Sequence, residues 1–410
     1  MFQKFWDNVS EQLPTLKEQF TDQINQINQS LAPLFGSAAS LSSLSTSSPA
    51  AAAIVTVGPL RVRILKKLGE GGYSYVYLAE EVPRNEDDGS SSSRPSLPPP
   101  PRQQCYALKK VLAGELEQLE AAKREIKVMQ DLPAHPNLLP LLEHAIIATA
   151  PTAARSSTAS SAIKHTVYML FPLMDINLWD YVQDRHTTKQ FLSSAEAFHI
   201  VSQLCSALEA MHTNNASHRD VKPHNILLTL NAPSKPWLQV GQKHAHKIDN
   251  DDDSAHLVAS PVPHTRSNRL PIAALMDFGS AGPATMRVTS RSEALTVQED
   301  AERHTTAPYR APELWDVPSS CTIDCKIDIW ATGCVLYYLL VGSSPFERTA
   351  NEAGGSLMLA IVNGQYTWPR DAVDRYDEHV RGLVDWCLKL KPEERPTAGE
   401  LLERITSGGP

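Results

Sequence analysis

The chain has 410 residues, and 38 Lys and Arg against 46 Asp and Glu give it a formal net charge of −8. Apolar residues make up 42% of the chain, which is enough to bury a sizeable core and excludes wholesale disorder. The mild acidity predicts no nucleic-acid partner, and six scattered cysteines are typical of reduced thiols in a cytoplasmic protein rather than of a disulfide framework.

Residues 1–36 carry apolar side chains at near-heptad spacing, which predicts an amphipathic or coiled-coil helix. One row, with members seven residues apart, consists of Trp6, Leu13, Phe20, Ile27 and Leu34. The stripe within 2–35 suits a membrane surface, a partner helix in a coiled coil, or the chain's own globular domain, and the sequence leaves this choice open. The Ser- and Ala-rich residues 37–59 predict a flexible linker.

Residues 60–406 have the composition of one folded domain with three inserts. Polar and small residues, with several prolines, dominate the ranges 84–103, 148–165 and 229–270. Such a composition cannot bury enough apolar area to offset the entropy of ordering. We therefore predict a single two-lobed domain that contains three disordered segments.

Glycines interrupt an alternating stretch at the start of this domain. Residues 60–68 alternate as a strand, Gly69, Gly71 and Gly72 follow, and the alternation then resumes. Glycine backbones between two strands can approach phosphate closely, although the pattern alone also fits an ordinary hairpin turn. A Rossmann site needs a helix directly after the glycines, so the strand found here points away from dinucleotide binding.

Two opposite charges follow the glycines. Lys109 ends a third apolar strand, and Glu125 lies on a strongly helical stretch, 115–130. A buried lysine that must stay charged to hold phosphate needs such a counter-ion. Taken singly, each residue also fits an ordinary surface charge.

The most specific pattern is the run 218–225, HRDVKPHN. Its Asp220, Lys222 and Asn225 bring a base, a cation that can neutralise phosphate and a metal-binding amide into one loop. An apolar strand then leads into Asp277, a carboxylate suited to Mg²⁺. The joint spacing argues against isolated turn residues.

In the order G-x-G, Ala-x-Lys, helical Glu, HRDxKxxN, DFG and APE, residues 60–406 resemble a eukaryotic protein kinase. The resemblance implies an α+β bilobal fold, with a small β-rich N-lobe and a large helical C-lobe. Lys222 together with Thr306 is similar to serine/threonine rather than tyrosine kinases. Ser74 in the glycine loop and the stretch 292–314 resemble the Numb-associated kinase group, most of all its myristoylated and palmitoylated serine/threonine kinase 16 branch.

The resemblance gives the matched catalytic-loop residues their roles. Asp220 orients the substrate hydroxyl and accepts its proton, while Lys222 steadies the γ-phosphate of ATP. Asn225 and Asp277 hold Mg²⁺. The hydroxyl of Thr306 bonds Asp220 and Lys222.

The same resemblance implies a nucleotide site in which Lys109, locked by Glu125, holds the α- and β-phosphates, and Phe171 is the gatekeeper. The residues implied in ATP binding are Leu68, Gly69, Glu70, Gly71, Gly72, Tyr73, Ser74, Val76, Ala107, Lys109, Pro172 and Met174. Two ion-pair partners are also implied: Asp328 braces the catalytic loop, and Arg395 pairs with Glu313.

The segment between Asp277 and Glu313 is expected to contain a helix at about 291–303. Ser290 and Glu293 form a capping-box signature that opens this helix, and we expect Leu295 and Val297 to pack it in place. In similar kinases Arg219 pairs with a phosphorylated residue of this segment. Because the caps of this helix already order the segment, pairing of Arg219 with a phosphate is less needed to order it. We therefore predict basal activity that autophosphorylation tunes.

Two functions from different classes fit the chain. One is an active kinase for protein substrates, and the alternative is a pseudokinase scaffold or binding module that transfers no phosphate. All four of Lys109, Asp220, Asn225 and Asp277 are present, which favours the active enzyme. By resemblance it acts in membrane trafficking, as a peripheral protein of Golgi or other endomembranes. Phe2 stands where that branch keeps an acylated glycine, so the helix at 2–35 is the expected replacement for the lipid.

Overall fold

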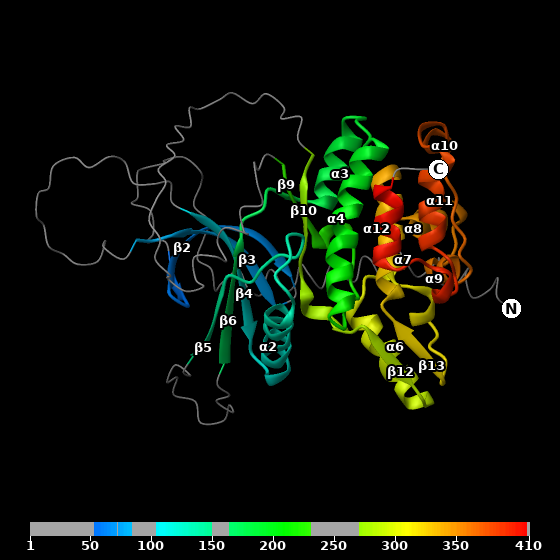
Figure 1. Cartoon of the computed structure of the whole chain (residues 1–410). Helices are drawn as coiled ribbons and strands as arrows, with labels where there is room; N and C mark the ends of the chain where they lie inside the picture. The colour runs from blue at the N-terminus through cyan, green and yellow to red at the C-terminus, as the bar shows by residue number, and fades with distance from the viewer. Residues whose placement is uncertain (1–52, 72, 84–103, 150–163, 231–269, 408–410) are drawn as a thin grey trace, which may run out of the picture. The chain divides into compact units, whose positions relative to one another are not determined.

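The computed structural model describes residues 53–71, 73–83, 104–149, 164–230 and 270–407. The helix predicted for 1–36, the range 84–103 and most of the other two predicted inserts lie outside these residues. The described residues belong to one compact unit, Ala52–Pro410, which joins a β-rich part to a helical part (Figure 1). The α+β fold implied by the resemblance is confirmed.

The β-rich part is a six-stranded sheet in which every neighbouring pair is antiparallel, in the order β1-β2-β3-β4-β6-β5. Helix α2 (Leu116–Asp131) packs against it through Leu119, Ala122 and Ile126. The strands are β1 (Ile54–Val57), β2 (Leu60–Gly71), β3 (Ser74–Glu81), β4 (Cys105–Ala113), β5 (Glu143–Thr149) and β6 (Lys164–Pro172).

Strand β1 corrects the predicted boundary between linker and domain. Residues 54–57 were expected in the flexible linker 37–59. They pair instead with β2, from Ile54 opposite Arg63 to Val57 opposite Leu60. Val57 and Val62 are fully buried in this hairpin. A strand of four residues is too short for its alternation to stand out from the Ser- and Ala-rich residues before it.

The edges of two predicted inserts also belong to strands. The range 148–165 overlaps the end of β5 and the start of β6, and Thr229 ends strand β9 (Ile226–Thr229). Strand pairing depends on backbone groups, which composition does not report. The described ends of these ranges are therefore ordered as strands.

The helical part is built around α7 (Lys326–Val341), which is buried on all sides and free of Lys, Arg and Glu after its first residue. Helices α4 and α11 pack on it and α12 packs on α4. The other elements are β7 (Ile176–Asn177), α3 (Leu178–Thr187), α4 (Ser194–Thr213), β8 (Ala216–Ser217), η2 (Pro223–Asn225), β10 (Ile272–Leu275), η4 (Phe278–Ser280), β11 (Gly282–Pro283), β12 (Thr285–Val288), α6 (Arg291–His304), η5 (Ala307–Tyr309), η6 (Pro312–Leu314), β13 (Cys321–Asp324), α8 (Pro345–Ala353), α9 (Leu357–Val362), α10 (Arg370–Arg375), α11 (Glu378–Cys387), η7 (Pro392–Glu394) and α12 (Ala398–Thr406).

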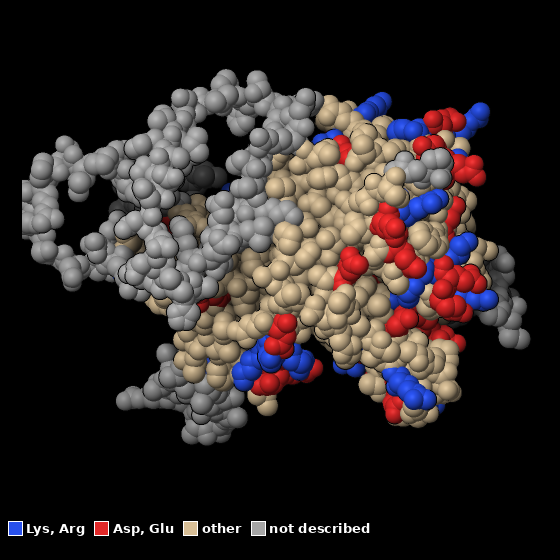
Figure 2. Space-filling view, in the orientation of Figure 1, with Lys and Arg blue, Asp and Glu red and all other residues tan. Residues whose placement is uncertain are grey.

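Within the described residues, no single helix has the length and apolarity to cross a bilayer; α7 and α8 reach that threshold only as a pair bent by 69°. Figure 2 shows acidic and basic side chains mixed around α10 to α12, and few over α3 and α4. On this face the two signs are interspersed rather than gathered into a basic patch.

The ion pair predicted between Arg395 and Glu313 is present and buried. The guanidinium donates to both carboxylate oxygens, at 2.7 and 2.8 Å, and to the carbonyl oxygens of Lys326, Lys389 and Leu390. Five donors are thus satisfied, which a buried arginine requires. The pair ties the segment that follows α6 to the segment that precedes α12.

Candidate active site

A cleft of about 800 Å³ lies between the sheet and the helical part. Ten of the residues predicted to bind ATP line it: Leu68, Gly69, Glu70, Gly71, Ser74, Val76, Ala107, Lys109, Pro172 and Met174. The predicted gatekeeper Phe171 lines it as well, together with Met129, Leu139 and Leu227, which the sequence motifs did not identify. Gly72 lies outside the described residues. Tyr73 does not line the cleft, because it sits at the hairpin tip with 65% of its surface exposed.

Lys109 projects into the cleft between two carboxylates. Its Nζ donates to both oxygens of Glu125, at 2.7 and 2.9 Å, and lies 3.6 Å from Asp277 Oδ1. Burial lowers the pKa of Lys109, but the attraction of Glu125 and Asp277 outweighs it, so the pKa lies above its ordinary value. Lys109 is therefore held charged, as a phosphate-binding lysine must be.

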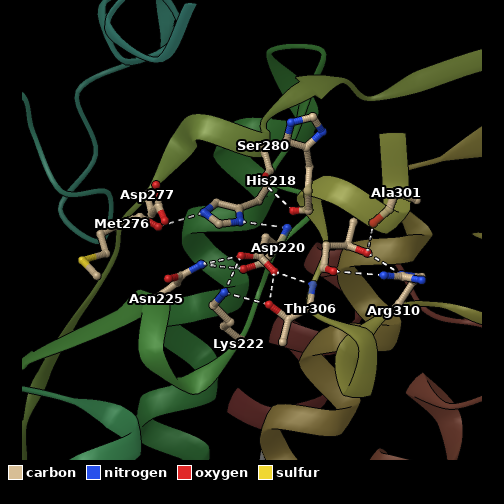
Figure 3. Close-up of polar contacts among 12 residues, drawn as sticks. His218, Asp220, Lys222, Asn225, Met276, Asp277, Ser280, Ala301, Thr306 and Arg310 are labelled. Carbon is tan, nitrogen blue, oxygen red and sulfur yellow. Dashed lines mark hydrogen bonds and ion pairs between the residues drawn. The ribbon is translucent and has the colours of Figure 1, made fainter. Parts of the chain in front are cut away.

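Asp220 is held by hydrogen bonds on both carboxylate oxygens (Figure 3). Oδ1 accepts from the backbone N–H and the hydroxyl of Thr306, at 2.9 and 2.7 Å. Oδ2 accepts from Lys222 Nζ at 2.7 Å and from Asn225 Nδ2 at 3.1 Å. Lys222 Nζ also donates to the Thr306 hydroxyl at 2.7 Å, so the contacts predicted for Thr306 are present.

Asn225 and Asp277 offer oxygens of the kind that Mg²⁺ prefers. The Nδ2 of Asn225 donates to the backbone oxygen and Oδ2 of Asp220, which commits the amide nitrogen and leaves the amide oxygen for other partners. In Figure 3 Asn225 and Asp277 lie on the same side of Asp220. Burial raises the pKa of Asp277, but Lys109, His218 and Lys222 outweigh it and keep the carboxylate ionised. The two side chains fit a magnesium site.

A buried carboxylate on α7 supports the catalytic loop from behind. Asp328 accepts from the Ser217 hydroxyl at 2.9 Å and from the backbone N–H groups of His218 and Arg219 at 2.9 and 2.8 Å. His212 Nε2 lies 2.9 Å from the same carboxylate. The bracing role of Asp328 was predicted, whereas His212 was missed, because nothing in the sequence shows that α4 brings it there.

Two site residues adopt left-handed backbone conformations. Arg219 and Asp277 both have φ of 66°, a value that costs a non-glycine residue of order 1 kcal/mol or more. Asp328 stabilises the first by accepting its N–H, and the buried Phe278 anchors the second through an edge-on contact with His218. Arg219 directly precedes Asp220 in the chain, and Asp277 carries the carboxylate that fits Mg²⁺.

The helix predicted at about 291–303 is α6, which opens at Ser290. The Ser290 hydroxyl accepts from Glu293 N at 3.2 Å, and Glu293 in turn accepts from the N–H and hydroxyl of Thr289. The expected packing of Leu295 is wrong, since this side chain is 43% exposed. Ala294, Val297 and Ala301 form the inward face, and Leu295 is turned about 100° away from Ala294.

Arg219 contacts α6 through a carboxylate that the sequence motifs did not reveal. Its Nη1 lies 3.7 Å from Asp300 Oδ2, and its Nη2 donates to the Met286 sulfur at 3.0 Å. A Cβ at Gly282 would overlap the guanidinium carbon, so a larger residue there would require the Arg219 side chain to shift. Asp300 thus pairs with Arg219, the residue for which the resemblance implies a phosphorylated partner.

Comparisons with known proteins agree with this geometry. Residues 100–405 match the protein kinase domain. Human serine/threonine-protein kinase 16 is 30% identical over 352 residues, which cover 86% of this chain and 91% of the relative. Kinase ppk13 of Schizosaccharomyces pombe is also 30% identical, over 86% of this chain and 92% of its own length. Kinase ENV7 of Saccharomyces cerevisiae is 27% identical, over 86% and 93%.

The His212–Asp328 pair makes stability depend on pH. Burial lowers the pKa of His212, but hydrogen bonds to Asp328 and Cys325 raise it from 6.5 to about 9. A raised pKa stabilises the fold below pH 6.5, and this contribution, on the order of 3 kcal/mol, is lost as the pH rises toward 9. We expect His212→Gln to remove most of this decline when urea unfolding is measured from pH 6 to 9.5. The control His379→Gln, at an edge-on contact with Phe198, should keep the wild-type slope; equal slopes in all three proteins would contradict the assignment.

Proposed function

Because the chain belongs to the family of eukaryotic serine/threonine protein kinases, we propose that its own Asp220 positions the substrate hydroxyl for phosphoryl transfer from ATP. The observation that carries the proposal is the two-sided restraint of the Asp220 carboxylate by Lys222, Asn225 and Thr306. A carboxylate that is fixed before substrate arrives loses little freedom when it receives a hydroxyl.

Asp220 would accept a hydrogen bond from the acceptor Ser or Thr hydroxyl and take its proton as the new bond to phosphorus forms. Lys222, which now bonds Asp220 and Thr306, would offset the charge on the transferred group. Phosphoryl transfer depends mainly on positioning and charge stabilisation. The bond from Thr306 to Asp220 therefore couples the order of the segment after α6 to the position of the base.

The cleft residues would hold ATP. Lys109, charged through Glu125, would hold the α- and β-phosphates, and the backbone of the glycine loop would cover them. The backbones of Pro172 and Met174 would bond adenine beside Phe171. Mg²⁺ held by Asp277 and Asn225 would neutralise phosphate charge. A pseudokinase would need one of these groups to be missing or displaced.

Autophosphorylation is proposed for residues 289–305. Thr296 and Arg219 line one cavity of about 210 Å³ under α6. A phosphate carries more negative charge than the carboxylate of Asp300 and is a stronger partner for an arginine. Modification of this segment would therefore strengthen a contact that already exists, which tunes activity rather than switching it on.

A role in membrane trafficking, on Golgi or other endomembranes, is proposed from the resemblance. The heptad-spaced residues 2–35 would supply the attachment, to a membrane surface or to a coiled-coil partner. This segment lies outside the described residues, so its spacing alone supports the proposal.

The first test of the proposal is Asp220→Asn, which keeps an oxygen for the Thr306 hydrogen bonds but removes the proton acceptor. We expect turnover of a generic protein substrate with Mg-ATP to fall by about 10²–10⁴, with ATP binding retained. Asp316→Asn, at a carboxylate whose side chain is 83% exposed, is the matched control and should stay at the wild-type rate. Near-normal turnover of the Asp220 variant would reject the role of Asp220.

The second test concerns basal activity. Protein made in bacteria together with a phosphatase should phosphorylate substrate at an initial rate close to that of the autophosphorylated protein, because α6 is capped and Asp300 already faces Arg219. Asp300→Ala should lower the rate of the unphosphorylated protein by leaving the guanidinium without its carboxylate. Inactivity of the wild type until a second kinase is added would restore an ordinary phosphorylation switch.

The third test is deletion of residues 1–36. We expect the truncated protein to leave the particulate fraction of cell lysates and to keep its turnover in solution. Vesicle co-sedimentation would separate a membrane from a protein partner. Identical fractionation of the truncated and full-length proteins would mean that the segment packs on its own domain.

A further inference from the structure

A cysteine, a histidine and an aspartate form one hydrogen-bonded cluster where α4 meets α7. Cys325, directly before α7, and Asp328, in its first turn, both bond the imidazole of His212 near the end of α4. The distance from His212 Nε2 to Asp328 Oδ2 is 2.9 Å. Asp328 supports the catalytic loop, whereas Cys325 has no part in the chemistry described above.

The imidazole in this cluster carries a positive charge at neutral pH. Burial lowers the pKa of His212, but the hydrogen bonds to Asp328 and Cys325 raise it to about 9. A protonated imidazole donates from both ring nitrogens. Because Nε2 serves Asp328, the other N–H is left for the Cys325 sulfur, which is the acceptor. The thiol is therefore in direct contact with a cation.

A helix terminus supplies a second positive neighbour. Cys325 immediately precedes α7, and its side chain makes no capping hydrogen bond to this helix. The unpaired N–H groups at the start of a helix carry a partial positive charge. The two carboxylates of this turn are already committed: Asp324 Oδ1 accepts from Lys326 N at 2.9 Å, and Asp328 accepts from His212 and from the catalytic loop.

Exposure further distinguishes Cys325 from the other thiols. All six cysteines are free, and the three on α4, α7 and α11 are buried, which raises their pKa: Cys205, Cys334 and Cys387. Cys105 is exposed, and Cys321 and Cys325 are partly exposed. Burial also raises the pKa of Cys321. Of the three thiols that solvent can reach, Cys325 is the one bonded to a charged histidine.

The thiolate is the reactive form of cysteine, and a charged histidine or a helix N-terminus favours it. We propose that Cys325 is an oxidation site, and that its reaction with peroxide lowers the kinase activity. The sulfur attacks one peroxide oxygen, so that an S–O bond forms and the O–O bond breaks. Sulfur loses two electrons and becomes a sulfenic acid. The second oxygen leaves as hydroxide and takes a proton from solvent to give water.

The product disturbs the bonds that hold the catalytic loop. The added oxygen needs space beside His212 and competes with Asp328 for its N–H groups. Asp328 also accepts the backbone N–H groups of His218 and Arg219, directly before Asp220. Oxidation should therefore loosen the loop that positions the base, and a thiol reductant should restore it. The inference rests on the proposed function, because it concerns regulation of the same site.

The first measurement compares the reactivity of the cysteines in the reduced full-length protein. Hydrogen peroxide is added with dimedone, which traps sulfenic acids, and mass spectrometry follows the labelling of each cysteine. We expect Cys325 to be labelled about 10-fold faster than Cys105, although Cys105 is more exposed. His212→Gln should slow labelling at Cys325 and leave Cys105 unchanged. Absence of label on the buried Cys205 shows that each variant is folded.

The second measurement follows activity. After peroxide treatment and removal of the excess with catalase, turnover of the wild type with Mg-ATP should fall by about 3- to 10-fold and recover with dithiothreitol. Cys325→Ser should match the reduced wild type and resist peroxide, because its hydroxyl keeps a hydrogen-bond acceptor but cannot form a sulfenic acid. The control Cys105→Ser should remain as sensitive as the wild type.

The outcomes distinguish the inference from the proposed function. Labelling of Cys105 as fast as Cys325, or equal loss of activity in the wild type and Cys325→Ser, overturns the inference while phosphate transfer by the reduced protein continues. Failure of the fully reduced wild type to phosphorylate any protein substrate overturns the proposed function itself.

Discussion

The buried carboxylate of Asp328 is the constraint on which the site depends. It accepts hydrogen bonds from two successive backbone N–H groups, His218 and Arg219, and from the Ser217 hydroxyl. These bonds fix the chain just before Asp220, where Arg219 has a left-handed backbone. Asp328 is carried by α7, and a helix buried on all sides cannot shift without disturbing the whole core. The position of Asp220 is thus set from the core through three hydrogen-bonded residues, Ser217, His218 and Arg219, and His212 supplies the compensating positive charge.

The charges in the cleft are arranged so that one carboxylate is satisfied and another stays available. Glu125 is buried and takes two hydrogen bonds from Lys109. Asp277 lies farther from the same lysine, at 3.6 Å, and its side chain is 45% exposed. The lysine is therefore held by one partner while the other carboxylate remains free for a cation. If Glu125 and Asp277 bound Lys109 equally closely, neither the lysine nor a carboxylate would be available to phosphate or metal. The difference between the two contacts keeps both available.

The sequence predicted the features that depend on residues close together in the chain, and it did not predict contacts between distant segments. Asp220, Lys222 and Asn225 belong to one short loop, so their proximity follows from covalent spacing, and the helical cap at Ser290 is likewise local. Strand β1 was missed because four residues carry too little pattern against a Ser- and Ala-rich background. The partners of Arg219 and of His212 come from segments far apart in the chain, and only the folded backbone brings them together. The exposed position of Tyr73 depends on the bend of a hairpin tip, which residue types do not determine.

Helix α6 is ordered by packing and by its cap, whereas its contact with Arg219 through Asp300 is weak. A small core of Val288, Ala294 and Val317 and the cap at Ser290 hold the helix in place by themselves. The guanidinium, however, meets a single carboxylate at 3.7 Å and a thioether sulfur, both weaker partners than a close bidentate anion. Burial lowers the pKa of Arg219, and Asp300 and Asp328 offset this effect only in part. The arginine is thus paired well enough to keep the segment folded, yet it retains attraction for a stronger anion. Order in this segment comes from local packing, and the one arginine that still attracts a stronger anion, Arg219, directly precedes Asp220.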